Sequence, residues 1–239
     1  MQTVAIGIFC KTPTPGLSKT RLSPPLRPDE CAAISACFIR DLAGTIADVA
    51  SDGASVGYAV YTPVGTETAL RTLLSPGFRL LPQCEGDFGV RLMTATRELL
   101  RTHAGAIMVN ADSPTLPASI LSAAVSATQR GNAVVLSPAL DGGYTLIGVS
   151  QMHLRLYEDI PWSTAAVFDK TVERAAEIGL PVVTVPGWYD VDDRASLAVL
   201  ESELSGEPPF PYALPGADAA ATRAHLTARA APLRVGSAR

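Results

Sequence analysis

Carboxylate side chains follow two apolar runs of the chain, at positions where buried strands would end. Asp112 comes just after residues 106–110, and the Asp-Val-Asp-Asp sequence at residues 190–193 follows residues 181–185. An apolar run that stops at a carboxylate is typical of a strand that carries the acid to the carboxyl edge of a sheet, where open α/β sheets bind ligands. Two carboxylates that met at such an edge would suit Mg²⁺, which takes one or two carboxylates together with water and substrate phosphate.

A basic loop follows the first apolar run, residues 3–10. The loop spans residues 11–22 and contains two prolines, one glycine and three cations, which are Lys11, Lys19 and Arg21. Proline and glycine shape the backbone, and the cations bring positive charge to the strand end, which favours a phosphate site. The loop is not a P-loop, because the pattern G-x-x-x-x-G-K-[ST] is absent. A solvated loop with incidental charges is the alternative interpretation.

Two further segments combine glycines with polar residues. Residues 83–91 contain Gly86 and Gly89, and residues 141–148 open with an Asp-Gly-Gly turn that indicates a hairpin or an insertion rather than a crossover. Trp162, on a loop after a proline, is either a core residue or the wall of an acceptor pocket. Strand ends of one parallel sheet converge, so the four groups that follow strands, at residues 11–22, 83–91, 112 and 190–193, could share a cleft. In such a cleft a metal and cations would stabilise a departing pyrophosphate or nucleoside diphosphate.

Each carboxylate also has a structural interpretation. Asp112 could cap a helix ahead of Pro114, and Asp192 or Asp193 could cap the helix expected after them and complement its dipole. The turn at Asp141 could be only a turn. The spacing of the residues leaves these alternatives open.

Strands and helices alternate along the chain. Strands are expected at residues 3–10, 55–61, 78–81, 106–110, 133–137 and 181–185, with a further strand after Gly143. Helices are expected at residues 29–50, 67–74, 117–130 and 194–204, in the segment after Gly89, and in a segment that has Ser163 or Thr164 as its N-cap and ends near residue 178. This alternation predicts an α/β fold with a mostly parallel central sheet. Residues 1–204 are expected to form a single domain, followed by a Pro- and Ala-rich extension at 205–239 that allows a helix at 219–229.

The composition argues against several classes of protein. The 239 residues are 47% hydrophobic and 18% charged with a net charge of −4, which favours a compact globule and argues against nucleic acid or an anionic membrane surface as a partner. No apolar run of about 18 residues or more indicates a membrane span, and no signal peptide is seen, so we expect a cytoplasmic protein. The four cysteines lack the spacing of metal ligands.

Six motifs, in order, resemble those of the bacterial DUF2064 proteins. They are K-T-P-x-P-G-x-x-K-T-R-L (11–22), Q-x-x-G-D-x-G-x-R (83–91), N-A-D-S-P (110–114), D-G-G-Y-x-L-I-G (141–148), W-S-T (162–164) and D-V-D-D (190–193). These proteins are GT-A-like nucleotide-diphospho-sugar transferases, also described as arsenosugar-biosynthesis or selenodomain-associated glycosyltransferases, and the resemblance covers residues 3–204. The L-x-G-G-x-G-x-R signature of sugar nucleotidyltransferases is absent, and K-T-R-L is also similar to phospholactate guanylyltransferases.

The resemblance implies a three-layer, Rossmann-like GT-A fold with a nucleotide at the carboxyl edge of the sheet. It implies that the phosphate site is lined by Lys11, Gly16, Lys19 and Arg21. It also implies that Gln83 and Gly86 lie where related nucleotidyltransferases hold the base.

The resemblance further implies a metal site and an acceptor site. Asp112 is similar to the metal-binding aspartate of the fold, and Asp190 or Asp192 to its second carboxylate, so Mg²⁺ or Mn²⁺ is the expected cofactor. The residues that would face the acceptor or sugar are Asp141, Gly142, Gly143, Tyr144 and Trp162. Asp112, Lys19 and Asp141 are the expected catalytic residues.

The first hypothesis is a Mg²⁺- or Mn²⁺-dependent glycosyltransferase with a nucleotide-activated sugar donor and a small-molecule acceptor. In this hypothesis Asp112 and Asp192 hold the metal, and Asp141 contacts or deprotonates the acceptor. Lys19 and Arg21 hold the phosphates. The alternatives are a nucleotidyltransferase that joins an NTP to a phosphorylated small molecule and releases pyrophosphate, and a nucleotide-binding protein without turnover. The sequence leaves open the acceptor, the base, the sugar and the oligomeric state, a homodimer included.

Overall fold

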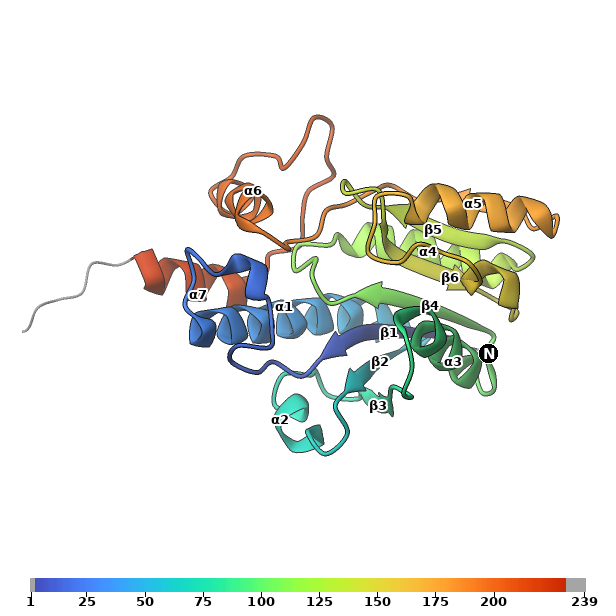
Figure 1. Cartoon of the computed structure of the whole chain (residues 1–239), viewed down its shortest axis with the longest axis horizontal. Helices are drawn as coiled ribbons and strands as arrows, with labels where there is room; N and C mark the ends of the chain where they lie inside the picture. The colour runs from blue at the N-terminus through green and yellow to red at the C-terminus, as the bar shows by residue number, and fades with distance from the viewer. Residues whose placement is uncertain (1–2, 231–239) are drawn as a thin grey trace, which may run out of the picture.

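The computed structural model describes residues 3–230, which fold around one seven-stranded sheet (Figure 1). The strands are β1 (Val4–Lys11), β2 (Ser55–Thr62), β3 (Arg79–Pro82), β4 (Gly105–Asn110), β5 (Val134–Pro138), β6 (Tyr144–Val149) and β7 (Val182–Thr184). Their order across the sheet is β3-β2-β1-β4-β6-β5-β7. Neighbouring strands are parallel except at β6, which is antiparallel to both β4 and β5. The prediction of a mostly parallel sheet is confirmed.

β1 lies near the centre of the sheet, and its side chains are apolar toward both faces. Val4, Ile6 and Ile8 on one face and Ala5 on the other have no exposed surface. A strand that is covered on both sides has no solvent face, which explains why the run shows no polar alternation. The register with β4 pairs Phe9 with Asn110, so the loops that leave the carboxyl ends of these two strands start side by side.

Helices cover both faces of the sheet and complete three layers. They are α1 (Pro28–Val49), α2 (Glu67–Arg71), α3 (Phe88–Leu100), α4 (Ala118–Arg130), α5 (Val167–Glu177), α6 (Arg194–Leu204) and α7 (Ala220–Ala230), with short 3-10 helices η1 (Thr20–Leu22), η2 (Ala50–Asp52) and η3 (Leu154–Tyr157). On one face α1, α4 and α6 share a core that includes Phe38, Ile120 and Leu197. On the other face α3 and α5 share a second core that includes Leu92 and Ala175. Between residues 3 and 230, none of the helices has both the length and the apolar composition needed to cross a membrane.

The Asp-Gly-Gly turn joins β5 and β6 into an antiparallel hairpin, as predicted. Gly142 in this turn has a φ of 89°, and a Cβ at this position would collide with the backbone of Ala165. Gly142 O also accepts a hydrogen bond from Phe168 N at 3.0 Å. The turn is therefore fixed against the start of α5, and glycine is required there because any side chain would separate the two segments.

The start of α5 differs from the prediction. The expected N-cap at Ser163 or Thr164 is wrong, since the helix begins at Val167 and Ala166 occupies the cap position without a side-chain hydrogen bond. Thr164 Oγ1 instead donates to Pro161 O at 2.7 Å and accepts from Ala166 N at 3.3 Å. The hydroxyl closes the turn that precedes the helix.

After α6 the chain returns to α1. Asp41, on α1, accepts hydrogen bonds from Ala221 N and Thr222 N, each at 2.8 Å. These N–H groups belong to the first turn of α7, where a helix has no backbone partners for them. A side chain from α1 thus caps a helix 180 positions further along the chain.

Candidate functional site

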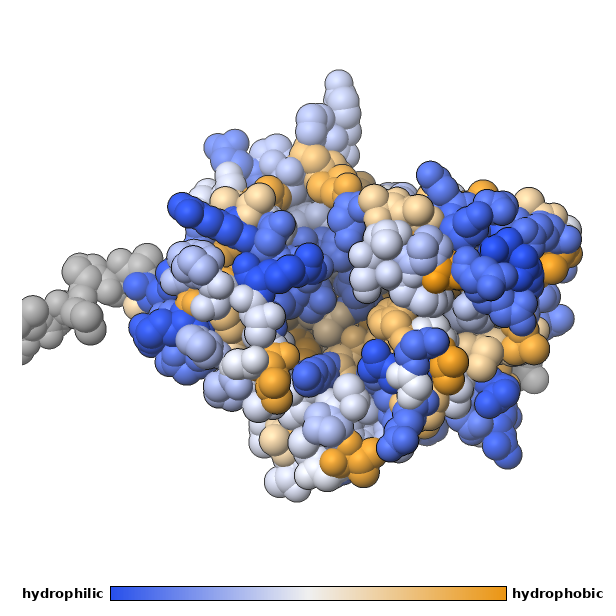
Figure 2. All heavy atoms as spheres, in the orientation of Figure 1, coloured by the Kyte–Doolittle hydropathy of each residue, from blue (hydrophilic) through white to orange (hydrophobic). Residues whose placement is uncertain are grey.

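The loop after β1 and the segments after β4 and β7 meet at the carboxyl edge of the sheet. Val191 N donates to Asp112 O at 2.8 Å, which joins the segment after β7 to the end of β4. Lys19, from the basic loop, reaches Asp192 across 173 positions of sequence. Residues of these segments line a cavity of about 260 Å³. Figure 2 shows this face of the molecule hollowed near its middle, with hydrophilic residues above the hollow.

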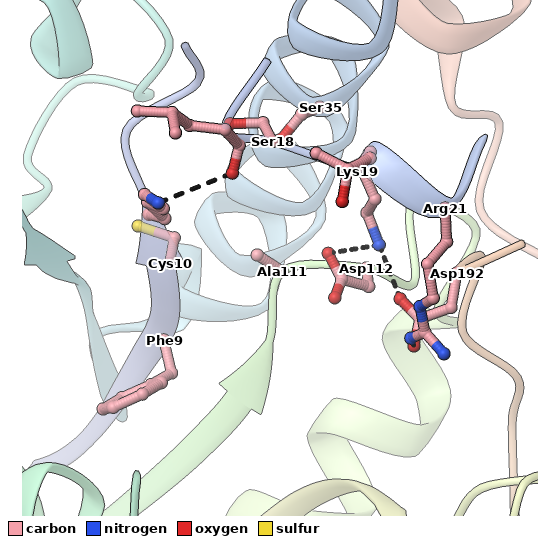
Figure 3. Close-up of a pocket in the computed structure, with 12 residues that line it drawn as sticks. Phe9, Cys10, Ser18, Lys19, Arg21, Ser35, Ala111, Asp112 and Asp192 are labelled. Atoms are coloured by element: carbon pink, nitrogen blue, oxygen red, sulfur yellow. Dashed lines mark hydrogen bonds and ion pairs between the residues drawn. The ribbon is translucent and has the colours of Figure 1, made fainter. Parts of the chain in front are cut away.

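Lys19 lies between two of the predicted metal ligands (Figure 3). Its Nζ is 2.7 Å from Asp112 Oδ1 and 2.9 Å from Asp192 Oδ1, and it donates to Val191 O at 2.7 Å. Only 7% of the side chain is exposed. Burial alone would lower the pKa of Lys19, but the charges and hydrogen bonds of Asp112 and Asp192 outweigh burial and raise it. Because an ammonium has three N–H groups, this arrangement uses all of them.

Lys11 and Arg21 are the exposed cations of the basic loop. Arg21 Nη2 is 2.7 Å from Asp192 Oδ2, and 69% of the arginine side chain is exposed. Lys11 Nζ makes only a long hydrogen bond of 3.5 Å to Leu17 O, and no carboxylate of residues 3–230 pairs with it. Burial would raise the pKa of Asp192, but Lys19 and Arg21 outweigh burial and lower it. Lys11 and Arg21 therefore retain donors that could meet a phosphate, whereas Lys19 does not.

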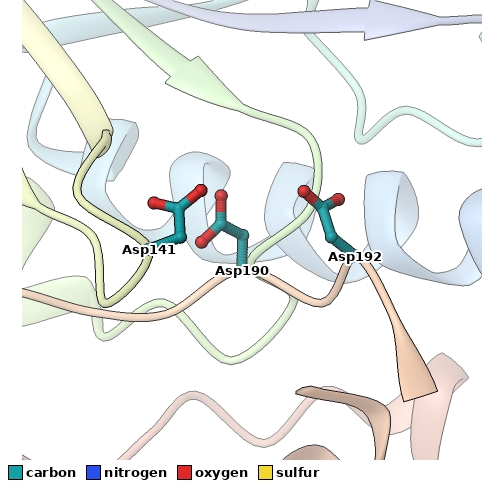
Figure 4. A group of neighbouring side chains, drawn as sticks. All are labelled: Asp141, Asp190 and Asp192. Atoms are coloured by element: carbon teal, nitrogen blue, oxygen red, sulfur yellow. The ribbon is translucent and has the colours of Figure 1, made fainter. Parts of the chain in front are cut away.

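Three carboxylates lie close enough together to hold one metal ion (Figure 4). One oxygen each of Asp141, Asp190 and Asp192 lies within 4.8 Å of the others. Asp141 comes from the turn before β6, and the other two come from the segment after β7. Carboxylate oxygens are the ligands that Mg²⁺ and Mn²⁺ prefer, so this donor set fits the expected cofactor. Asp141, expected at the acceptor, joins the metal-ligating candidates, and Asp112 lies against Lys19.

The pKa of Asp190 reflects the crowding of these carboxylates. Burial, followed by the negative charges of Asp141, Asp192 and Asp112, raises the pKa of Asp190 from 3.8 to about 7. Its Oδ2 accepts one hydrogen bond, from Asn110 Nδ2 at 3.2 Å. A divalent cation in this position would compensate the excess negative charge.

Asp193 caps a helix. Its Oδ1 accepts from Ser196 N at 2.9 Å at the start of α6, and Ser196 Oγ accepts from Asp193 N at 3.0 Å. These reciprocal hydrogen bonds form a capping box. The capping interpretation is thus confirmed for Asp193. It is wrong for Asp112, because the N-cap position of α4 is occupied by Pro117.

Gln83 is buried, and its amide is used within the protein. Nε2 donates to Cys10 O at 3.0 Å and to Val60 O at 2.9 Å, and Oε1 accepts from Arg91 Nη1 at 2.8 Å. The side chain therefore joins the carboxyl ends of β1 and β2 and orients the guanidinium of Arg91. The expected contact of Gln83 with a nucleotide base would have to share or replace one of these hydrogen bonds.

The site glycines expected from the sequence lie in turns around the same edge. Gly16, Gly86 and Gly142 have φ angles of 74°, 123° and 89°. Gly143 N donates to Asp141 Oδ1 at 2.9 Å, which orients that carboxylate toward the acidic group. Because glycine has no side chain, only the backbone groups of these residues can contact a ligand.

A row of aromatic side chains borders a second, apolar cavity beside Asp112. The ring centroids of Phe9 and Phe88 are 5.3 Å apart, and those of Phe88 and Trp162 are 5.0 Å apart. The cavity of about 130 Å³ extends from Phe9 and Phe88 to Asp112 and Tyr144. Phe9 and Phe88 are residues of the site that the sequence motifs do not predict. Phe88 had a signal, because an aromatic residue set among glycines in a loop is hard to bury, whereas Phe9 belongs to an apolar strand and had none.

Tyr144 and Trp162 relate differently to this cavity, because Tyr144 lines it, whereas Trp162 packs against Phe88 and is not among the lining residues. Tyr144 lines the cavity, but its hydroxyl is buried and has no hydrogen-bond partner among residues 3–230. Burial raises the pKa of Tyr144 well above its ordinary value, so the hydroxyl stays protonated at neutral pH. Trp162 packs so closely on the first turn of α3 that a Cβ at Gly89 would collide with its indole.

Comparison with known sequences gives one family. The profile of the family described as "Uncharacterized protein conserved in bacteria (DUF2064)" matches residues 45–164. Among curated proteins, no sequence matches the chain.

Solved structures of similar fold carry the names of transferases. A "putative nucleotide-diphospho-sugar transferase" from Desulfovibrio desulfuricans G20 is 26% identical, with 96% of each chain covered and a TM-score of 0.82. A 4-diphosphocytidyl-2C-methyl-D-erythritol synthase from Anaerococcus prevotii DSM 20548 is 9% identical, with 85% of this chain and 99% of its own covered and a TM-score of 0.57. A cytidylyltransferase from Leptospira borgpetersenii is 12% identical, with 96% of each chain covered and a TM-score of 0.53. The last two likenesses show the fold alone, and the predicted nucleotide-diphospho-sugar transferase fold is confirmed.

Proposed function

The chain belongs to the DUF2064 family, and from that premise we propose that it is a metal-dependent glycosyltransferase, which moves a sugar from a nucleotide-activated donor to a small-molecule acceptor. One observation carries the proposal. Lys11 and Arg21 line one cavity at the carboxyl edge of the sheet together with Asp112 and Asp192, and Asp192 also belongs to the group of three carboxylates. A diphosphate with a divalent cation needs both kinds of group at once, because its oxygens are shared between the cation and positively charged side chains.

The donor binds along the polar part of the site in this proposal. Lys11 and Arg21 contact the phosphates, since both retain free N–H donors. Asp141, Asp190 and Asp192 hold Mg²⁺ or Mn²⁺. A bound divalent cation supplies stabilisation of the negative charge that develops on the departing nucleoside diphosphate.

The acceptor binds toward the apolar part of the site. Phe88 and Trp162 form an aromatic wall there, and an aromatic face suits the C–H surface of a sugar or another apolar group. Asp141 belongs to the acidic group and is exposed in the turn before β6, so it is also the carboxylate that we assign to contact with an acceptor hydroxyl.

Nucleotidyl transfer is the second candidate, in which a phosphorylated small molecule attacks an NTP and pyrophosphate leaves. The cytidylyltransferases among the solved structures of similar fold favour it. The same cations and carboxylates would serve either reaction, because pyrophosphate and nucleoside diphosphate are both diphosphate leaving groups.

Product analysis separates these candidates. The purified protein is incubated with Mn²⁺ or Mg²⁺ and with panels of nucleotide sugars and nucleoside triphosphates, and released nucleoside diphosphate and pyrophosphate are measured separately. We expect nucleoside diphosphate from a nucleotide sugar, lost by about 100-fold or more in Asp192→Asn. Asp48→Asn, at an exposed position of α1, is the matched control and should keep the activity. Release of pyrophosphate would contradict glycosyl transfer and identify the protein as a nucleotidyltransferase. Binding of a nucleotide without either product would identify a nucleotide-binding protein without turnover.

A further inference from the structure

The ammonium of Lys19 is surrounded by oxygens in the manner of a bound cation. Asp112 Oδ1, Asp192 Oδ1 and Val191 O all lie 2.7 to 2.9 Å from Nζ, and the ring centroid of Phe38 is 5.7 Å away. With 7% of its side chain exposed, Lys19 is shielded from solvent. Figure 3 shows the ammonium directed between the two carboxylates.

A divalent cation and this ammonium compete for the same oxygens. Asp192 holds Lys19 with Oδ1 and Arg21 with Oδ2, so both of its oxygens are already engaged. Mg²⁺ draws carboxylate oxygens to about 2.0–2.1 Å, and an oxygen that shares its electrons with Mg²⁺ is a weaker acceptor for an ammonium on the same carboxylate. Mutual repulsion of two buried cations adds to the conflict.

We propose that Lys19 is a built-in cation that fills the space between Asp112 and Asp192 until a divalent cation displaces it. The released ammonium then turns into the cavity, where it becomes a phosphate ligand. The inference rests on the metal dependence of the proposed function, and it gives Lys19 two successive positions. It also explains how two carboxylates stay close together in the metal-free protein without a penalty from repulsion, since an unpaired buried charge is costly.

The lysine content of the chain allows a direct test on the unaltered protein. The chain has three lysines, which are Lys11, Lys19 and Lys170. The metal-free protein is acetylated with an amine-reactive reagent, and each lysine is followed by peptide mass spectrometry. We expect Lys19 to react at least about tenfold more slowly than Lys11, because its side chain is buried and its ammonium is held by three oxygens. Saturating Mn²⁺ alone should raise the reactivity of Lys19 about tenfold and leave Lys170, which pairs with Glu173, unchanged.

Two results of this labelling would overturn the inference. One is a Lys19 that reacts as fast as Lys11 in the metal-free protein. The other is a Lys19 that stays protected while electron paramagnetic resonance shows that Mn²⁺ is bound, because the metal would then occupy the acidic group without displacing the ammonium.

Variants of the site test the competition by a second route. Lys19→Met should bind Mn²⁺ alone about tenfold more tightly than the parent, and Mn²⁺ should raise its Tm more. Arg21→Met is the matched control, because it removes a cation from the same Asp192 carboxylate but not from the space beside Asp112, and its gain should be about threefold or less. If Mn²⁺ affinity rose equally in the two variants, the loss of any nearby positive charge would explain the change, and the inference would be contradicted. Adding Asp112→Asn to Lys19→Met should cancel the gain.

These experiments use no nucleotide or sugar, so they fail independently of the proposed reaction. If Mn²⁺ displaced Lys19 in a protein that turns over no donor, the inference about Lys19 would be supported and the proposed glycosyltransferase activity would be contradicted. Binding of Mn²⁺ by Lys19→Met but not by the parent would contradict the inference, because Lys19 would then exclude the metal and never be displaced by it. Absence of binding in both would remove both proposals.

Discussion

Asp190 lowers the stability of the fold at neutral pH, because burial and three neighbouring carboxylates raise its pKa from 3.8 to about 7. In the unfolded chain an aspartate has a pKa of about 3.9. Between about pH 4 and pH 7 the folded protein therefore binds more protons than the unfolded chain, and its stability falls as the pH rises through this window. The loss is complete about one pH unit above the pKa of Asp190 in the folded protein.

Asp190→Asn should remove this loss. The amide still accepts the hydrogen bond from Asn110 but carries no charge, so we expect stabilisation on the order of 2 kcal/mol at pH 8, or a Tm about 5 °C higher. The difference should shrink as the pH falls toward 4. Thermal unfolding from pH 4 to pH 8 measures it, with Asp48→Asn as the control that should show no such trend. A difference that did not depend on pH would show that the carboxylate charge is not its cause.

The residue types of the site were open to prediction, but their pairing was not. The rule that strand ends converge brings Lys19, Asp112 and Asp192 to one edge, and the structure has them there. Which cation meets which carboxylate depends on side-chain burial and on contacts across 173 positions, and no local pattern carries that information. The assignment of Lys19 to phosphates assumed a free ammonium for this reason.

At the scale of elements, the capping box of α6 supports the segment that carries the acidic group. Asp193→Ala removes the acceptor for Ser196 N and should destabilise the protein by about 1 kcal/mol. Asp193→Asn keeps a capping acceptor and should stay within a few tenths of a kcal/mol of the parent. Urea unfolding distinguishes the two variants. If both lost the same stability, the charge of Asp193 near the helix dipole would matter more than its hydrogen bond.

The strands and long helices could be predicted because their apolar residues repeat with the right period, as in α1 and β1. The start of α5 could not. Its position is set by the hairpin turn, where Gly142 O accepts from Phe168 N and the backbone of Ala165 packs on Gly142. The local sequence favoured Thr164 as a cap. The contact with a turn more than twenty residues earlier determines instead where the helix begins.

At the scale of the whole molecule, Asp41 connects the two ends of the described chain. Asp41→Ala removes both acceptors for the first turn of α7, so we expect α7 to detach from α1 more often and Arg223 to be cleaved by trypsin about tenfold faster. Asp48→Ala, on the same helix but exposed, is the control. Digestion followed by mass spectrometry measures the rate. An unchanged rate would mean that the apolar contacts of α7 hold it without the cap.

The strand order also determines when each strand can pair with its neighbours during synthesis on the ribosome. β3, β2, β1 and β4 form one half of the sheet and all come from the chain up to Asn110, while the other half begins only with β5. Until β6 is made, β4 is an unpaired apolar edge, and such edges invite pairing with other chains. At about 5–20 residues per second this exposure lasts a few seconds in each round of translation. The antiparallel strand that closes the sheet is thus also the step at which the nascent chain stops being vulnerable to aggregation.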